Sequence, residues 1–526
     1  MKKMNKLLAL VLAMVMVLGL AASAFADGPA TEPTTPTNYD LTITGTKTGH
    51  TYAVYQIFTG DISGNAPNYV LSNIKYGQNY IPAGKNVGEV VPESEITAIT
   101  DADTFAQSVT LTGEVFKTVE SADGSTTITG LPAGYYLVKD SGTVTGQDSY
   151  TKFILQVVGD TSVAVKSDVP TVEKKVKENV KQVTGNNDVR IPEYILTAQY
   201  NDVADYNIGD KVPFELIGTL PDNLADYDTY KYYFHDTLST GLTYNSDAVV
   251  YVVNEGVKTD VTSAFTITCD NGALEIKCDD ITAIEVVTVT KDSYIVVDYT
   301  ATLNTAAVIG LEGNPNEVYL EFSNNPNEGG EGDTGTTPED KVIVFTYELD
   351  VTKVDGQDKN KKLEGAEFKL RNTAGKWAVV NDDFKVTGWA QTEEAGSTLT
   401  SNADGLFKVI GLDDGTYYLK ETKAPTGYNL LANEIELKVI ATTVNNQTWA
   451  YTPSDALTAL QIKVGTETTD GNTGSGIVGT TVENNAGATL PSTGGIGTTI
   501  FYVLGGMLVV CAVVLMVSKK RMSAEG

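Results

Sequence analysis

Short alternating segments, each bounded by turn residues, dominate this 526-residue chain. Val, Ile, Thr and Tyr recur at every second position in segments such as 248–253, 286–290 and 342–352. Side chains on a β-strand alternate between its two faces, so this period predicts strands with one buried face. Gly, Asn and Asp separate the segments, and only 95–99 and 102–110 favour short helices. The pattern predicts an all-β protein made of immunoglobulin-like β-sandwich domains.

Three changes of composition divide the chain into an elongated tandem array. A Pro/Thr-rich stretch covers Pro29–Thr37, Pro170 follows a polar turn, and 324–340 is rich in Gly, Asn, Glu and Pro. Domains usually contain about 100–200 residues, so we expect three of them. Their predicted bounds are 39–169, 170–335 and 341–489.

The N-terminal segment has the three parts of a secretory signal peptide. Lys2, Lys3 and Lys6 form a positive start, and an apolar run follows over 7–22. Small residues close the segment at Ala24-Phe25-Ala26. We predict that residues 1–26 are removed after Ala26 and that the mature chain is exported.

A second apolar segment lies near the C-terminus and follows a short polar peptide, Leu490-Pro491-Ser492-Thr493-Gly494. The segment 499–517 is long enough to cross a bilayer core of about 30 Å as a helix. A basic tail over 518–526 follows, in which Lys519, Lys520 and Arg521 favour the cytoplasmic side. The order is a short peptide, a transmembrane segment and a basic stop.

This arrangement resembles the Leu-Pro-x-Thr-Gly cell-wall sorting signal of Gram-positive bacteria. The resemblance implies that a sortase cuts between Thr493 and Gly494 and passes the acyl group of Thr493 to an amine. It also implies attachment to peptidoglycan at a Gram-positive cell surface. The alternative is a plain C-terminal anchor helix preceded by a turn.

Composition excludes several other classes of protein. The formal charge of −30 repels nucleic acid. With only two His and no Cys/His cluster, we expect neither a metal site nor a cofactor. Cys269 and Cys278 flank an Asn271-Gly272 hairpin turn at positions too far apart for a disulfide, and we expect both to be buried.

The predicted third domain places an acid and an amine on inward strand faces. Leu419 and Glu421 share one face of a strand, and Leu349, Val351 and Lys353 share one face of another. A buried carboxyl group without a cation is costly, so Glu421 needs a partner. Burial lowers the pKa of a lysine, which makes the Lys353 amine a nucleophile.

An amide group completes this set. Val482 and Asn484 alternate in the same way, and a neutral amine beside a carboxamide can form an amide and release ammonia when an acid carries the protons. The segment 417–428 resembles the E-box of sortase-assembled pilins. The resemblance implies a collagen-adhesin B-type domain with a Lys353–Asn484 isopeptide bond and Glu421 as the catalytic acid.

The middle domain repeats the pattern. Lys174 alternates with apolar neighbours and is predicted to point inward, with Lys175 outward. The segment 234–242 resembles the Asp-Thr-Leu-x-x-Gly-Leu segment of A-type isopeptide domains, which implies Asp236 as the acid. Asn316 and Asn324 are both candidate acceptors for Lys174. We favour Asn316, because Asn324 lies beside a proline at the strand end.

The first domain resembles the third in one segment, since 130–140 aligns with 411–421 and matches Asp140 to Glu421. It offers no clear inward lysine, so the sequence assigns no isopeptide bond there and leaves open whether the domain carries one. Pilin families carry their assembly lysine in a motif resembling Val-x-Val-Tyr-Pro-Lys-Asn between the first two domains. Here 163–168 occupies that place, which implies Lys166. Lys139 and Lys177 are the lesser candidates.

Together these features resemble a major (shaft) pilin, which is a structural protein and not an enzyme. The predicted partners are a sortase, further copies of the chain, peptidoglycan and, as an option, a host surface ligand. Thr493 of one subunit would join Lys166 of the next. The alternatives are a wall-anchored monomeric adhesin and a minor pilin.

Overall fold

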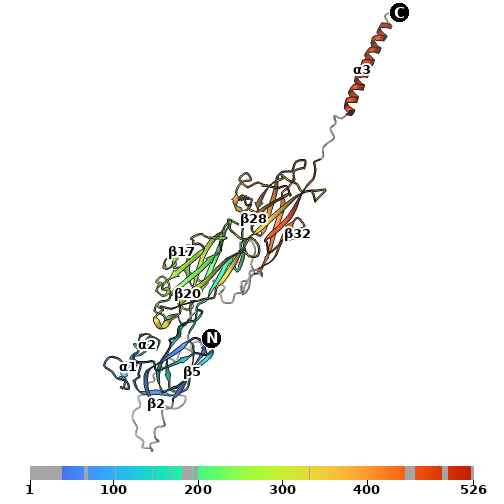
Figure 1. The fold of residues 1–526 in the computed structure, drawn as a ribbon. Helices are drawn as coiled ribbons and strands as arrows, with labels where there is room; N and C mark the ends of the chain where they lie inside the picture. Colours follow the sequence, from blue (N-terminus) through green and yellow to red (C-terminus); the bar gives the residue numbers. More distant parts are fainter. Residues whose placement is uncertain are drawn as a thin grey trace, which may run out of the picture.

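The computed structural model describes residues 38–63, 69–100, 102–144, 146–165, 167–179, 192, 200–330, 332–444, 456–487 and 496–522. Figure 1 shows three β domains in a row, with one long helix beyond the third. The all-β prediction is confirmed, and the elongated order follows the sequence.

Two sheets form the first domain, with strand orders β5-β1-β8 and β3-β2-β6-β7, and β4 pairs with β2. Its strands are β1 Tyr39–Thr46, β2 Thr51–Ser63, β3 Val70–Tyr76, β4 Lys117–Glu120, β5 Gly124–Leu131, β6 Gly134–Asp140, β7 Lys152–Val157 and β8 Thr161–Ala164. Two short helices, α1 Glu93–Ala98 and α2 Ala102–Ser108, lie where the sequence favours helix.

Two seven-stranded sheets form the middle domain, with orders β10-β9-β12-β19-β15-β16 and β11-β22-β20-β13-β18-β17; β14 and β21 pair with β19 and β20. Its strands are β9 Val172–Lys177, β10 Tyr200–Asn201, β11 Val203–Asp205, β12 Lys211–Gly218, β13 Tyr232–Leu238, β14 Leu242–Tyr244, β15 Val249–Asn254, β16 Val257–Asp260, β17 Thr266–Asp270, β18 Ala273–Cys278, β19 Tyr294–Leu303, β20 Asn314–Ser323, β21 Thr334–Thr336 and β22 Asp340–Phe345. Single 3-10 turns are η1 Leu224–Asp226, η2 Thr262–Ala264, η3 Ile281–Ala283 and η4 Pro326–Glu328.

The third domain pairs a three-stranded sheet, β28-β23-β33, with an eight-stranded one, β26-β25-β24-β29-β30-β31-β32, in which β27 pairs with β24. Its strands are β23 Tyr347–Asp355, β24 Glu367–Asn372, β25 Trp377–Val380, β26 Val386–Ala390, β27 Leu399–Thr400, β28 Leu406–Leu412, β29 Gly415–Lys423, β30 Ile435–Thr443, β31 Leu457–Val464, β32 Glu467–Asp470 and β33 Ile477–Asn484. Helix α3, Ile496–Met522, follows.

The structure corrects the predicted boundary between the second and third domains. Strand β22 pairs with β20, with Val342 opposite Asn316, so the middle domain extends to Phe345. The polar stretch 324–340 is a loop with short elements at the edge of this sheet, and its composition alone could not distinguish such a loop from a domain linker.

Two local predictions were wrong. The segment 286–290 forms no strand, and Val286 is exposed, because alternation without a neighbouring strand does not fix a strand. Cys269 lies opposite Leu274, as the hairpin register predicts, but its side chain is exposed; Cys278 is buried, and both are free thiols.

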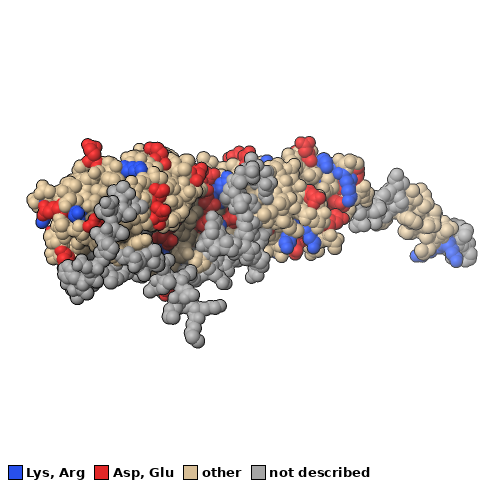
Figure 2. Space-filling view, turned by 90° about the horizontal axis from the view of Figure 1, so that it is seen from below, with Lys and Arg blue, Asp and Glu red and all other residues tan. Residues whose placement is uncertain are grey.

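The acidic composition appears on the surface. Figure 2 shows carboxylate side chains distributed along this face of the β domains, with fewer lysine and arginine side chains among them. The sign of the surface agrees with the formal charge of −30. Such a surface favours solubility and disfavours contact with nucleic acid.

The second and third domains share a tightly packed joint. One apolar core runs through both domains. Across the joint, the Ile208 amide donates to the Gly411 carbonyl at 3.0 Å, and the Tyr417 hydroxyl donates to Asn207 at 3.0 Å. The backbones of Gly310 and Gly476 approach so closely that a Cβ on either would meet the other. The joint therefore tolerates no side chain at these positions.

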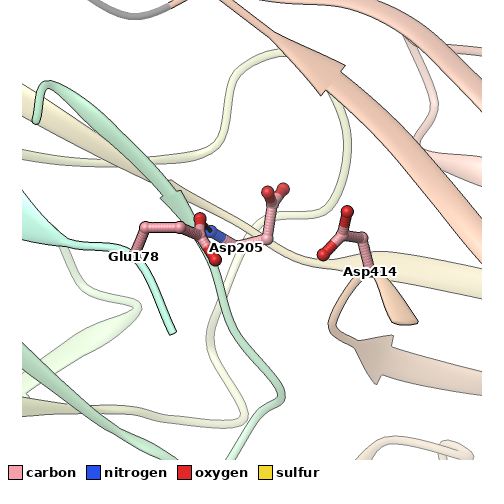
Figure 3. Close-up of side chains that lie close together, drawn as sticks. All are labelled: Glu178, Asp205 and Asp414. Atoms are coloured by element: carbon pink, nitrogen blue, oxygen red, sulfur yellow. Dashed lines mark hydrogen bonds between the residues drawn. The ribbon is translucent and has the colours of Figure 1, made fainter. Parts of the chain in front are cut away.

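Three carboxylates gather at the same joint (Figure 3). Glu178 follows β9, Asp205 ends β11, and Asp414 lies in the turn between β28 and β29; their oxygens lie within 4.8 Å of one another. The Asp205 amide donates to Glu178 at 3.3 Å, and the Tyr347 hydroxyl donates to Asp205. Carboxylates at such spacing are common without an ion, so we assign no metal here and treat the cluster as part of the joint.

A glycine substitution tests the joint. Gly310→Ala should lower the free energy of unfolding more than Gly365→Ala, because both glycines have φ near +80°, but the new Cβ lies 2.6 Å from the Gly476 nitrogen only at position 310. The shared left-handed strain costs about 1–2 kcal/mol for each variant. Calorimetry of the mature chain measures the difference, and equal losses would show that the close approach carries no energy.

Candidate functional site

Lys353 lies inside the third domain. It points inward from β23, and its side chain is completely buried. The amine lies 3.5 Å from Oε1 of Glu421, donates to the Val482 carbonyl at 3.3 Å and sits 5.6 Å from the centre of the Phe368 ring. Burial lowers the pKa of Lys353 to about 8, against the opposing pull of Glu421.

Glu421 lies between this amine and an amide. Its Oε2 accepts a hydrogen bond from Nδ2 of Asn484 at 3.0 Å and another from the Leu431 backbone at 2.8 Å. Asn484 is buried, and it also donates to the Asn429 carbonyl at 2.5 Å. The predicted Lys353, Glu421 and Asn484 are therefore brought together in one buried cluster.

Strand topology explains this convergence. β23 and β33 are the first and last strands of the third domain, and they pair side by side in parallel. Lys353 lies opposite Val482, and Asn484 lies one alternation further along the same strand. Glu421 comes from β29 in the other sheet, so the cluster joins the two layers of the sandwich.

Lys174 occupies the corresponding place in the middle domain. It points inward from β9 and is completely buried, and its amine donates to Asp236 of β13 and to the Tyr299 hydroxyl of β19 at 3.0 Å. The ammonium also lies 5.6 Å from the centre of the Phe214 ring. Burial lowers the pKa of Lys174 and raises the pKa of Asp236, so desolvation drives both groups toward their neutral forms.

Tyr299 connects this pair to the amide. Its hydroxyl donates to Oδ2 of Asp236 at 2.9 Å and accepts from Nδ2 of Asn316 at 2.7 Å. Sequence reasoning did not identify Tyr299. The signal was present in its alternation with Val297 and Ala301, which places a polar hydroxyl on an inward strand face.

The structure distinguishes the two candidate acceptors. Asn316 joins the Lys174 cluster through Tyr299, whereas Nδ2 of Asn324 lies 3.4 Å from the Asp148 carbonyl of the first domain. Asn324 thus belongs to the joint between the first two domains.

Both clusters leave the same oxygens without a hydrogen bond. Among the described residues, no hydrogen bond is made to Oδ1 of Asn484, Oε1 of Glu421, Oδ1 of Asn316 or Oδ1 of Asp236, although the Lys353 amine lies 3.5 Å from Oε1 of Glu421. Buried polar atoms without partners are costly. Burial raises the pKa of Asp236, and a proton on that acid, donated to the Asn316 oxygen, would satisfy both atoms of that pair.

Lys175 does not behave as predicted. It lies on the opposite face of β9, but it is buried, with its amine 2.7 Å from Asp202 and 3.6 Å from Glu173. The segment that carries Asp202, between β10 and β11, covers this face of the strand. An alternating pattern identifies the two faces of a strand but not which of them another segment covers.

The structure describes the surroundings of the residues predicted to link subunits, but not those residues themselves. Lys166 and the peptide 490–494 lie outside the described residues. Val165, Ser167 and Asp168 line a cavity of about 310 Å³ together with Lys47 and Asp148. Of the lesser candidates, Lys139 is partly buried, which lowers its pKa, and Lys177 lies over the ring of Tyr200.

Helix α3 has the length and composition of a membrane span over Ile500–Arg521, and its last turn carries Lys519, Lys520 and Arg521.

Three family models match successive parts of the chain. Residues 208–326 match the Gram-positive pilin backbone subunit 2, Cna-B-like domain; residues 347–452 match a prealbumin-like fold domain; and residues 482–523 match the LPXTG cell wall anchor motif.

A relative matches along nearly the whole length. The trypsin-resistant surface T6 protein of Streptococcus pyogenes serotype M6 is 25% identical over 91% of this chain and 94% of its own. Together, these matches support a sortase-assembled backbone pilin of Gram-positive bacteria. The solved T6 backbone pilin, with a modular three-domain structure, shares the pilin's fold at a TM-score of 0.50 and 22% identity, over 86% of this chain and 99% of that one. The major pilin SpaD of Corynebacterium diphtheriae aligns at a TM-score of 0.46 and 17% identity, over 86% and 98%.

The matched models and the relative support a general role for the pilin. It is a structural subunit of a pilus shaft and not an enzyme. It is processed by a sortase, polymerises into pili and is anchored in the cell wall of the Gram-positive surface.

The buried pair in the middle domain has an energetic consequence. Asp236→Ala should lower the free energy of unfolding by about 3–5 kcal/mol, because it leaves the Lys174 amine buried without its acid. Asp292→Ala, which removes a carboxylate that is 80% exposed in the same domain, should have little effect. Denaturant unfolding followed by tyrosine fluorescence measures both, and equal effects would contradict a tight coupling between Lys174 and Asp236.

Proposed function

We propose that the pilin is a shaft subunit cross-linked both within itself and to its neighbours. Within the subunit, Lys353 joins Asn484 and Lys174 joins Asn316 through isopeptide bonds. Between subunits, Thr493 of one joins Lys166 of the next. The observation that carries the internal bonds is the repeated grouping of a buried amine, a buried acid and an amide whose oxygen has no donor.

The internal reaction needs no reagent beyond these groups. The neutral Lys353 amine attacks Cγ of Asn484, and Glu421, in its acid form, donates a hydrogen bond to Oδ1 as negative charge develops there. The new C–N bond forms, the old one breaks, and Glu421 transfers a proton from the attacking amine to the leaving group. One ammonia molecule departs, and an amide remains.

The same chemistry fits the middle domain with one added group. Asp236 serves as the acid, and burial already favours its protonated form and the neutral form of Lys174. Tyr299 contacts the amine, the acid and the amide, so it orients all three reacting groups. Its ring also shields them from water, which strengthens each interaction.

The bond between subunits uses the sorting signal. A sortase cleaves after Thr493 and retains its acyl group, and the Lys166 amine of another copy then displaces the enzyme to form an amide. At the base of the fibre, a peptidoglycan amine takes the place of Lys166. The proposal assigns no host ligand to the shaft subunit.

Chain order gives these bonds a mechanical role. Tension that enters at Lys166 crosses from Lys174 to Asn316, continues to Lys353, crosses to Asn484 and leaves at Thr493. The strands between the bonded residues carry no load. The first domain precedes Lys166 and lies outside this path.

Intact mass tests the internal bonds. The mature chain should weigh less than its sequence by the mass of two ammonia molecules, and Lys353→Ala or Lys174→Ala should each restore one. Tyr299→Phe should leave the middle-domain bond incomplete. A mature chain with the full sequence mass would overturn the proposal of internal bonds without affecting its assignment as a pilin.

Polymer formation tests the linkage residues. Cells that express the pilin with its sortase should show a ladder of SDS-resistant polymers, and Lys166→Ala should abolish it while wall-anchored monomer remains. Lys177→Ala is the control and should keep the ladder. A ladder that survives Lys166→Ala places the linkage at another lysine, and monomer alone from the native chain would favour an adhesin or a minor pilin.

A further inference from the structure

The first and third domains each contain a three-stranded sheet with the same strand arrangement, β5-β1-β8 in the first and β28-β23-β33 in the third. In the first domain β1 pairs with β5 antiparallel and with β8 in parallel, and in the third β23 pairs with β28 and β33 in the same senses. Leu41 lies opposite Ile128 and Thr161. Leu349 takes the corresponding place on β23, which puts the two domains in one structural register.

One tyrosine in each domain aligns the strand that carries the buried acid, which is β6 in the first domain and β29 in the third. The Tyr136 hydroxyl donates to the carbonyl four residues earlier, that of Pro132, and the Tyr417 hydroxyl does the same to Asp413. Asp140 lies four residues after the first tyrosine, as Glu421 does after the second. Asp140 is therefore the structural counterpart of the acid Glu421, and its side chain is completely buried.

The register also shows what the first domain lacks. Thr161 lies opposite Leu41 and Val478 lies opposite Leu349, so these two residues correspond. Ser167 follows Thr161 by as many residues as Asn484 follows Val478, and it therefore occupies the place of Asn484. Past a bulge in β1, Thr46 occupies the place of Lys353; it is buried and donates to the Ala122 carbonyl. Neither of these two places holds an amine or an amide, so Asp140 has no cross-linking pair at the positions that Lys353 and Asn484 occupy in the third domain.

A cation reaches Asp140 from a different strand. Tyr52 on β2 lies opposite Asp140, and Phe368 on β24 lies opposite Glu421, so these two strands correspond. His50 lies two residues before Tyr52, and Ala366 lies two residues before Phe368. His50 is therefore the counterpart of the small, buried Ala366. The His50 side chain is 7% exposed, and Nδ1 contacts Oδ2 of Asp140. Its other nitrogen, Nε2, lies 3.1 Å from Asp148. With a carboxylate on each nitrogen, the ring carries both protons and a positive charge.

His50 thereby holds a loop that contacts the middle domain. Nδ2 of Asn324 lies 3.4 Å from the Asp148 carbonyl, the Tyr150 hydroxyl donates to Asp333 at 2.8 Å, and the Tyr150 amide donates to the Asn324 carbonyl at 2.8 Å. Residues 144 and 146–150 thus contribute to the joint between the first two domains, and Asp148 connects that joint to His50.

We infer that His50, held between Asp140 and Asp148, is an ionic clamp that takes the place of the covalent bond in the first domain and fastens the joint with the middle domain. The inference uses the register of the third domain but not its reaction, so it stands whether or not the internal amides form. It assigns the first domain a reversible ion pair, whereas the other two domains contain the amine, acid and amide of a proposed covalent bond.

The clamp should depend on pH. Hydrogen bonds to Asp140 and Asp148 raise the pKa of His50 from 6.5 to about 9, against the cost of its burial. The other groups around it are Lys47, 3.2 Å from Asp148; the Tyr52 ring, stacked on His50; and Glu120, which accepts from Thr51. A raised pKa gives stability that is complete below about 6.5 and is lost as the pH rises through about 9.

Differential scanning calorimetry of the full mature chain between pH 6 and 10 tests the clamp. His50→Gln should lower the Tm of the first-domain transition by about 5 °C or more at pH 6.5 and remove its decline above pH 7. His235→Gln is the matched control, because His235 also lies between two carboxylates, Glu275 and Glu321, but on the middle domain. It should leave the first-domain transition unchanged.

A second measurement covers the case in which His50→Gln fails to fold. In the native chain, the NMR signals of the His50 ring should titrate near pH 9, and Asp148→Asn should lower that midpoint. Titration at the ordinary value for histidine, or a first-domain Tm that His50→Gln does not change, would overturn the clamp. Intact mass of the same samples separates this outcome from any failure of the internal amide bonds.

Discussion

The removal of lysine amines from water is the constraint on which the rest of the pilin depends. A buried ammonium is costly, and each of the two clusters offsets this cost with an acid and an aromatic ring. The same desolvation that makes the amine expensive makes it nucleophilic. The domains must therefore be well packed before the amine can react, so folding precedes any chemistry.

Alternation along strands predicted much of this arrangement and failed where neighbours matter. It placed Lys353, Lys174 and Asn484 on inward faces, because each alternates with apolar residues that mark the buried face of its strand. It could not show that β22 completes the middle sheet or that a segment covers Lys175, since both depend on which segments lie side by side. Alternation also places Tyr299 on an inward face, but its role is visible only once the three other strands that contact it lie beside β19.

The first and third domains share one strand arrangement but hold their buried acids with different partners. The first and third share a register down to a tyrosine and an acid, yet one places a histidine beside that acid and the other a lysine and an asparagine. The difference agrees with the proposed path of tension, which bypasses the first domain. A domain outside the path needs only a fastening strong enough for its joint, and an ion pair between buried groups supplies it.

The parallel pairing of β23 and β33 also sets an order of events in time. Asn484 ends the last strand, and the residues between it and α3 can extend over at most about 40 Å. The third domain therefore cannot close until its final strand has left the export channel. By then the anchoring helix has followed it to the membrane. Closure of this domain and retention at the membrane thus occur in the same short interval of export, beside the surface where the sortase acts.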